Sequence, residues 1–248
     1  MKNNLKKICL VVAALPVLLA SAVSHAAPIT FASFSDKAAS QFVFTNNLAT
    51  GTAASASFSS VSNAINFSFT SVPGLDAALQ GVQNAHLTYS PSKTTAPANR
   101  SDDDLDSQPM NSTTIISIVR DTAYKTLTNL LTVTFSAGTK RLTIRGDDGG
   151  NSLTEAAGTG SGQSVAFTSD FLSFSGSTTA KDIALAFTGL SSPLAINANG
   201  FLNSFTATGS GNFSADPLPV TVPEPGSYAM LLAGLGLMGV ALRSRKIL

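Results

Sequence analysis

The sequence has one cysteine, two histidines and no tryptophan, and only 12% of its 248 residues are charged. One thiol cannot build a disulfide framework or a cysteine-ligated metal centre within a single chain. A formal net charge of +1 gives no basic field with which to neutralise nucleic-acid phosphates. These absences exclude a disulfide scaffold, a cysteine-based metal protein and a nucleic-acid binder, and we expect no cofactor.

Small hydroxyl side chains are abundant instead, because the chain contains 33 Ser and 26 Thr. Phe, Ile, Leu and Val recur among them along most of the length, so the composition does not indicate a disordered chain. The sequence therefore predicts a folded, weakly charged protein.

The N-terminal residues have the layout of a secretory signal peptide. Three lysines in the first seven residues precede the uncharged run 8–20, and small residues then stand at Ser24 and Ala26. The apolar run is too short to favour a permanent membrane span. We predict cleavage between Ala26 and Ala27, so that residues 1–26 are a signal peptide and the protein is exported.

The other end of the chain carries a proline-flanked motif, an uncharged run and a basic cluster, in that order. The fifteen residues of the run span roughly 22 Å as a helix, short of a ~30 Å hydrocarbon core. Basic residues after this run would stay in the cytoplasm. The prolines before it keep the backbone extended, a shape that a protease can bind. The features are the motif Val222, Pro223, Glu224 and Pro225, the helix ends Tyr228 and Leu242, and the basic stop Arg243, Arg245 and Lys246.

This arrangement closely resembles the PEP-CTERM sorting signal, in which a Pro-Glu-Pro motif precedes a short membrane helix and basic residues. The resemblance implies recognition by an exosortase, a membrane-embedded processing enzyme of Gram-negative bacteria. It also implies transient anchoring in the inner membrane, cleavage near the motif, and release toward the cell surface or an exopolysaccharide matrix. Exosortase is thus the expected partner, and exopolysaccharide is a further candidate.

Between the two ends, the sequence predicts one all-β passenger domain at 27–215, a linker at 216–221 and the sorting signal at 222–248. Apolar and polar residues alternate with a period of two, as expected for antiparallel sheets covered on one face. We expect an antiparallel β-sandwich, of which the jelly roll is one form, and a short helical segment at 75–82. The predicted strands include 42–44, 65–69, 87–89, 116–118, 131–135, 142–144, 183–187 and 205–207.

An acidic segment within 91–109, predicted as a solvated loop, offers the only candidate metal ligands. Asp102, Asp104 and Asp106 have the spacing with which many calcium loops begin, and oxygen ligands suit Ca²⁺. An EF-hand would continue with Gly and Glu where Ser107 and Thr113 stand, so that template fails. A non-standard calcium site and an ordinary acidic loop both remain open.

His86 is the one histidine left after removal of the signal peptide, and the alternation places it on the exposed face of its strand. No Gly-x-Ser-x-Gly elbow accompanies it, and no carboxylate pair is evident. By elimination we expect a non-enzymatic surface or matrix protein. The alternatives are a carbohydrate-binding or adhesive sandwich, which needs exposed aromatic side chains, and a secreted hydrolase, which needs a cleft lined by acids.

Overall fold

The computed structural model describes residues 29–47, 55–60, 62–110, 113–136, 142–175 and 179–220. These residues form an all-β structure in which every strand pair is antiparallel, as the alternation predicts. The strands of the large sheet are β1 (Ile29–Asp36), β2 (Phe42–Asn47), β3 (Ser55–Ser60), β4 (Asn63–Phe69), β5 (Val82–Tyr89), β6 (Ser92–Thr94), β7 (Asn99–Arg100), β8 (Leu105–Met110), β9 (Thr114–Tyr124), β10 (Leu127–Ser136), β11 (Leu142–Asp147), β12 (Ser152–Gly158), β13 (Ser164–Thr168), β15 (Asp182–Thr188) and β16 (Phe205–Ala215). A separate small sheet pairs β14 (Leu172–Ser173) with β17 (Leu218–Pro219).

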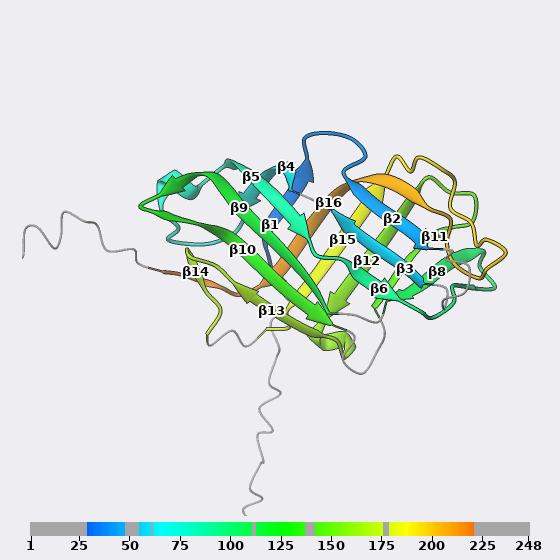
Figure 1. Cartoon of the computed structure of the whole chain (residues 1–248). Helices are drawn as coiled ribbons and strands as arrows, with labels where there is room; N and C mark the ends of the chain where they lie inside the picture. Colours follow the sequence, from blue (N-terminus) through cyan, green and yellow to red (C-terminus); the bar gives the residue numbers. More distant parts are fainter. Residues whose placement is uncertain are drawn as a thin grey trace, which may run out of the picture.

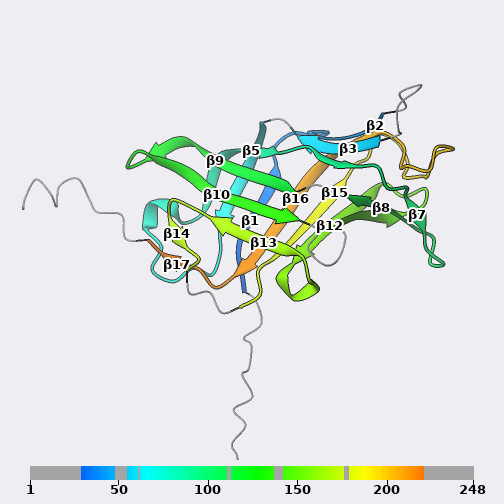
Figure 2. The ribbon, with the colours of Figure 1, turned by 60° about the horizontal axis from the view of Figure 1, so that its bottom comes forward.

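The large sheet is continuous and curls on itself. Its main path is β13-β10-β9-β5-β4-β1-β16-β15-β12-β11-β8-β7, and β2, β3 and β6 branch from β16. Figures 1 and 2 show β9, β10 and β13 crossing over β1, β16, β15 and β12, so that the two halves of the sheet face each other. The sandwich expected from the sequence is therefore formed by one hydrogen-bonded sheet and not by two separate ones.

The core between these halves is built mainly from phenylalanine. The Phe167 ring of β13 packs against Phe31 of β1 at 5.3 Å and Phe213 of β16 at 6.3 Å between centroids. Phe58 of β3 lies 4.8 Å from Phe187 of β15. Since each aromatic side chain buries 150–250 Å², these contacts between distant strands account for much of the driving force for closure.

A bend runs across three neighbouring positions of the sheet. At each position one strand ends and the next begins, and the branch β2-β3-β6 starts at this bend. β1 and β2 pair with the same edge of β16, at residues 210–215 and 205–207, and the five residues between them leave the ladder. The same interruption separates β3 from β4, which pair with β2 and β1. It also separates β5 from β6, which pair with β4 and β3. Sheets turn corners at such bends because a strand can leave one sheet for another there.

Polar side chains accept hydrogen bonds from backbone amides at this bend. Asp36 accepts a hydrogen bond from the Gly209 amide at 2.7 Å, and Thr208 accepts one from the Ser40 amide at 3.1 Å. Ser40 has a φ of 61°, a left-handed conformation that lets the chain turn sharply. The bend is thus a built feature of the fold.

One local expectation was wrong. The segment 91–109 is not a solvated loop, because it contains β6, β7 and the first part of β8, where Asp106 and Gln108 are buried. Their polar groups have partners: Gln108 donates to the Ala96 carbonyl at 2.8 Å and accepts from the Leu202 amide at 3.3 Å. The short helical segment expected within 75–82 is present as a single 3₁₀ turn at Ala77–Leu79, after which the chain enters β5.

Candidate functional site

The predicted targeting residues lie outside the part of the chain that the structure describes. This applies to the cleavage residues Ala26 and Ala27, the motif Val222, Pro223, Glu224 and Pro225, the helix ends Tyr228 and Leu242, and the basic residues Arg243, Arg245 and Lys246. Within the described residues, no helix has the length and apolar character needed to cross a bilayer. The structure does describe the passenger up to Val220, two residues before the motif.

The passenger holds its last residues against the fold. β17 lies within the predicted linker and pairs with β14, with Leu218 opposite Ser173 and Pro219 opposite Leu172. The Val220 amide donates to the Phe171 carbonyl at 2.9 Å. Two residues before Leu218, the Asp216 carboxylate accepts a hydrogen bond from the Thr179 hydroxyl at 2.9 Å. The chain is therefore fastened almost to the start of the Pro-Glu-Pro motif.

β14, which receives β17, is itself firmly anchored. Asp170 accepts hydrogen bonds from the amides of Thr128 and Asn129 at 3.1 and 2.8 Å. Phe171 is buried, and the Phe174 ring packs on Phe31 at 5.3 Å. The edge that β14 offers to the end of the passenger is therefore part of the rigid core.

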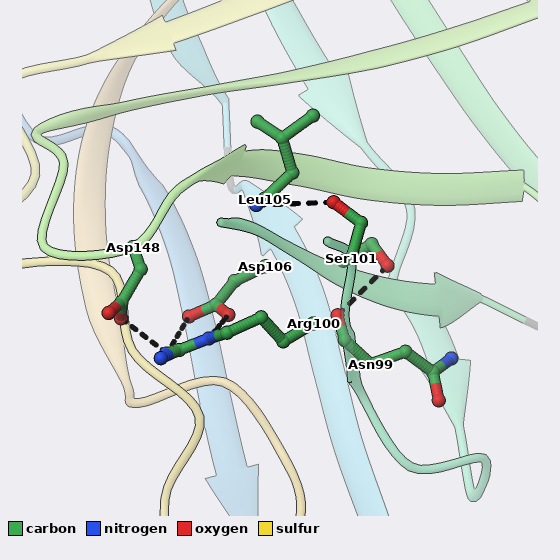
Figure 3. Close-up of polar contacts among 7 residues, drawn as sticks. Asn99, Arg100, Ser101, Leu105, Asp106 and Asp148 are labelled. Atoms are coloured by element: carbon green, nitrogen blue, oxygen red, sulfur yellow. Dashed lines mark hydrogen bonds and ion pairs between the residues drawn. The ribbon is translucent and has the colours of Figure 1, made fainter. Parts of the chain in front are cut away.

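The acidic segment forms an ion-paired cluster (Figure 3). Arg100 donates through Nε to Asp106 Oδ1 at 2.8 Å and through Nη2 to Asp106 Oδ2 at 3.2 Å, and Nη2 also lies 2.5 Å from Asp148 Oδ1. Asp106 is completely buried, whereas Asp102 and Asp104 are exposed. Such a two-pronged contact satisfies both carboxylate oxygens, so Asp106 is committed to Arg100 and stabilises the β7–β8 hairpin.

Asp102, Asp104 and Asp106 do not come together as a calcium site would require. Over the described ranges, no three His, Cys, Asp or Glu side chains gather in a way that could hold a metal ion. Asp104 contributes its backbone instead, since its carbonyl accepts the Asp148 amide at 2.9 Å and ties the acidic segment to the turn after β11.

His86 lies on the exposed face of β5, as its place in the alternation predicts. Its Nδ1 is 2.6 Å from Asp121 Oδ1 on the neighbouring strand β9, and both side chains are partly exposed. Val119 is directly opposite His86 in the ladder. The structure thus brings together a histidine and a carboxylate on an open sheet face, in the manner of an ordinary surface ion pair.

The interior contains a polar pair that the sequence analysis missed. Tyr89 of β5 donates its hydroxyl to Glu155 Oε2 of β12 at 2.6 Å, and both side chains are buried between the halves of the sheet. Burial raises the pKa of Glu155 to about 7, although the Tyr89 hydrogen bond opposes this change. Burial, and next the charge of Glu155, raise the pKa of Tyr89 well above its ordinary value.

A signal for this pair was present in the sequence. Glu155 has the same parity as Leu153 and Ala157 in its strand, so the alternation places a carboxyl group on the apolar face. Asp106 likewise has the same parity as Met110, so the alternation places its carboxyl group on the buried face of the strand. Their partners, Tyr89 and Arg100, become apparent only when the strands are paired.

The aromatic side chains face inward. All fifteen phenylalanines are described, fourteen of them are buried, and Phe174 is packed against the core. Tyr89 is buried, and the half-buried Tyr124 donates its hydroxyl to Asp76 at 2.6 Å. Sugar-binding faces usually stack a ring on the sugar, and these rings are occupied in packing.

Comparison with known proteins gives one match. A family model described as the PEP-CTERM protein-sorting motif matches residues 221–246. No curated protein and no solved structure matches the chain significantly. The matched segment begins one residue after Val220, whose amide is bound by the Phe171 carbonyl next to β14. The chain therefore carries a PEP-CTERM protein-sorting motif, which implies export and exosortase-dependent sorting to the cell surface or extracellular space.

Proposed function

We propose that the chain is a non-enzymatic surface or matrix protein whose β-rich passenger is released when an exosortase removes the tail. The match at residues 221–246 is the observation that carries this proposal. A signal peptide at 1–26 would start export, and the segment 228–242 would hold the precursor in the inner membrane during processing. Exopolysaccharide is the candidate partner after release.

The contacts of the acidic and basic side chains support a structural passenger. Asp106 is bound by Arg100, Glu155 by Tyr89, and His86 by Asp121, so each candidate for acid–base chemistry has a partner within the fold. The alternative of a carbohydrate-binding module loses support because the phenylalanine rings are packed in the interior. A passenger that acts through its outer polar surface fits these observations best.

Alanine at both Pro223 and Glu224 tests the sorting step. In a bacterium that carries an exosortase, we expect the double variant to keep its tail, because the extended, acidic motif that the enzyme reads is lost. The measurement is the intact mass of the protein recovered from the envelope and the medium. Alanine at Pro193 and Asp102, both exposed on passenger loops, is the matched control and should be processed normally. Normal tail removal in the motif variant would contradict the proposal.

A further inference from the structure

Residues 216–220, here called the strap, form only a short ladder with β14. Two of the five residues, Pro217 and Pro219, have no amide hydrogen to give to a ladder. The strap pairs with β14 over only two residue pairs, and Leu218 remains 64% exposed. A two-stranded ribbon of this size is marginally stable by itself. The strap is therefore among the parts of the passenger that open most easily.

The strap stands directly before the segment that the processing enzyme has to bind. Val222 follows Val220 by two residues, which span at most about 7 Å when extended. Proteins commonly bind an extended peptide as an added strand, using backbone groups on both sides of the contact. While the strap is paired, the backbone of Leu218 and Val220 is already engaged with β14 and Phe171.

We propose that the strap is a releasable element, and that the exosortase acts on the tail only after residues 216–220 have left the edge of β14. This inference rests on the proposed function. The strap has the properties such a step needs: its prolines keep it extended after release, and β14 remains fixed in the core through Asp170 and Phe171. Release breaks the small sheet and the hydrogen bonds of Asp216 and Val220, and it leaves the large sheet intact.

A disulfide between the strap and β14 tests this directly. Ser173 and Leu218 are opposite each other, and neighbouring antiparallel positions lie within disulfide reach. The passenger has no cysteine of its own, because Cys9 lies in the predicted signal peptide. In the Ser173→Cys, Leu218→Cys variant we expect tail removal at least tenfold slower than in the wild type, with recovery when a reductant opens the cross-link.

The matched control is Ser152→Cys, Thr188→Cys, which joins two exposed, opposed residues of β12 and β15 away from the strap. It should be processed at the wild-type rate, with or without reductant. In a third variant, eight Gly and Ser residues are inserted after Val220 in the cross-linked protein. This insertion should restore processing, because it supplies free extended chain next to the motif.

Each outcome has a distinct meaning. Wild-type processing of the strap-linked protein overturns the releasable strap and leaves the sorting proposal standing. Slow processing that the inserted residues do not relieve also overturns it, because access to the motif is then not the limiting step. A wild-type protein that never loses its tail overturns both the sorting proposal and this one.

Discussion

Two carboxyl groups, the buried Glu155 and the half-buried Asp36, make the stability of this passenger depend on pH. Burial raises the pKa of Glu155 to about 7, and burial, opposed by the bonds to Gly209 and Asn63, raises that of Asp36 to about 6. Each group therefore binds its proton more tightly in the folded than in the unfolded chain. Its stabilising contribution is complete below the unfolded pKa, near 4, and is lost as the pH rises through the folded pKa.

Glu155→Gln tests the larger of these effects. Between pH 5 and pH 8 we expect the free energy of unfolding of the wild type to fall, with roughly 2–3 kcal/mol of the loss due to Glu155. The glutamine carbonyl can still accept the Tyr89 hydroxyl but cannot ionise, so the variant should lose the part of the slope that comes from Glu155. Urea unfolding at both pH values measures this. An equal pH dependence of the unfolding free energy in the two proteins would show that the pKa of Glu155 is the same in the folded and unfolded chain.

Arg100→Met isolates the ion-paired cluster. The substitution leaves the Asp106 carboxylate buried without its cation, and an unpaired buried charge is strongly destabilising. We expect Tm to fall by on the order of 5 °C. Asp102→Asn, at an exposed position of the same segment, should leave Tm unchanged. Scanning calorimetry of the two variants decides the matter, and equal Tm values would mean that the cluster contributes nothing to stability.

At the scale of elements, the bend depends on a close approach between β16 and β2. Gly209 lies where β1 has left the ladder and β2 has not yet joined, and a Cβ on it would overlap the Phe42 ring. The ring also packs on Phe187 at 4.9 Å, so it has little room to move away. A side chain at position 209 would push apart the two strands that form the branch.

Gly209→Ala should therefore destabilise the passenger by about 1–3 kcal/mol, the usual effect of overpacking a core. Gly160→Ala is the matched control, because a Cβ there meets only the Ala180 side chain, at an ordinary 3.9 Å. Denaturant unfolding of both variants provides the comparison. A stable Gly209→Ala protein would indicate that β2 can shift without loss of the branch.

The alternation of apolar and polar residues predicted which segments are strands, but it did not predict which strands pair with each other. Ile183, Leu185 and Phe187 are buried on one face of β15, as their spacing indicates, because parity is a local property of a strand. The pairing of β1 with β16 joins residues such as Ile29 and Ala215, and nothing local in either segment specifies the other. The acidic segment was misread for the same reason, since Asp106 becomes tolerable in the interior only beside Arg100.

The candidate site divides in a similar way. A short, contiguous motif such as Pro223-Glu224-Pro225 can be read directly from the sequence, and the family match confirms it. The strap could not be predicted, because two prolines within five residues are typical of a linker. Its pairing depends on β14, which lies about forty-five residues earlier in the sequence.

At the scale of the whole molecule, β16 is the central strand, since it pairs with β1 and β2 on one edge and with β15 on the other. It is also the last strand of the large sheet in chain order, whereas β1 is the first. Contacts between segments so far apart form slowly, because a long loop has to close before they gain any stability.

The position of β16 determines the order in which strands can pair if the chain crosses a membrane from its N-terminus. β1 and β4 reach the far side early but wait there with an unpaired edge until residues 205–215 emerge. By then only the strap separates the emerging chain from the sorting motif. Under the proposed function, the passenger would complete its fold only a few residues from the site of tail removal, so folding and processing would compete in time.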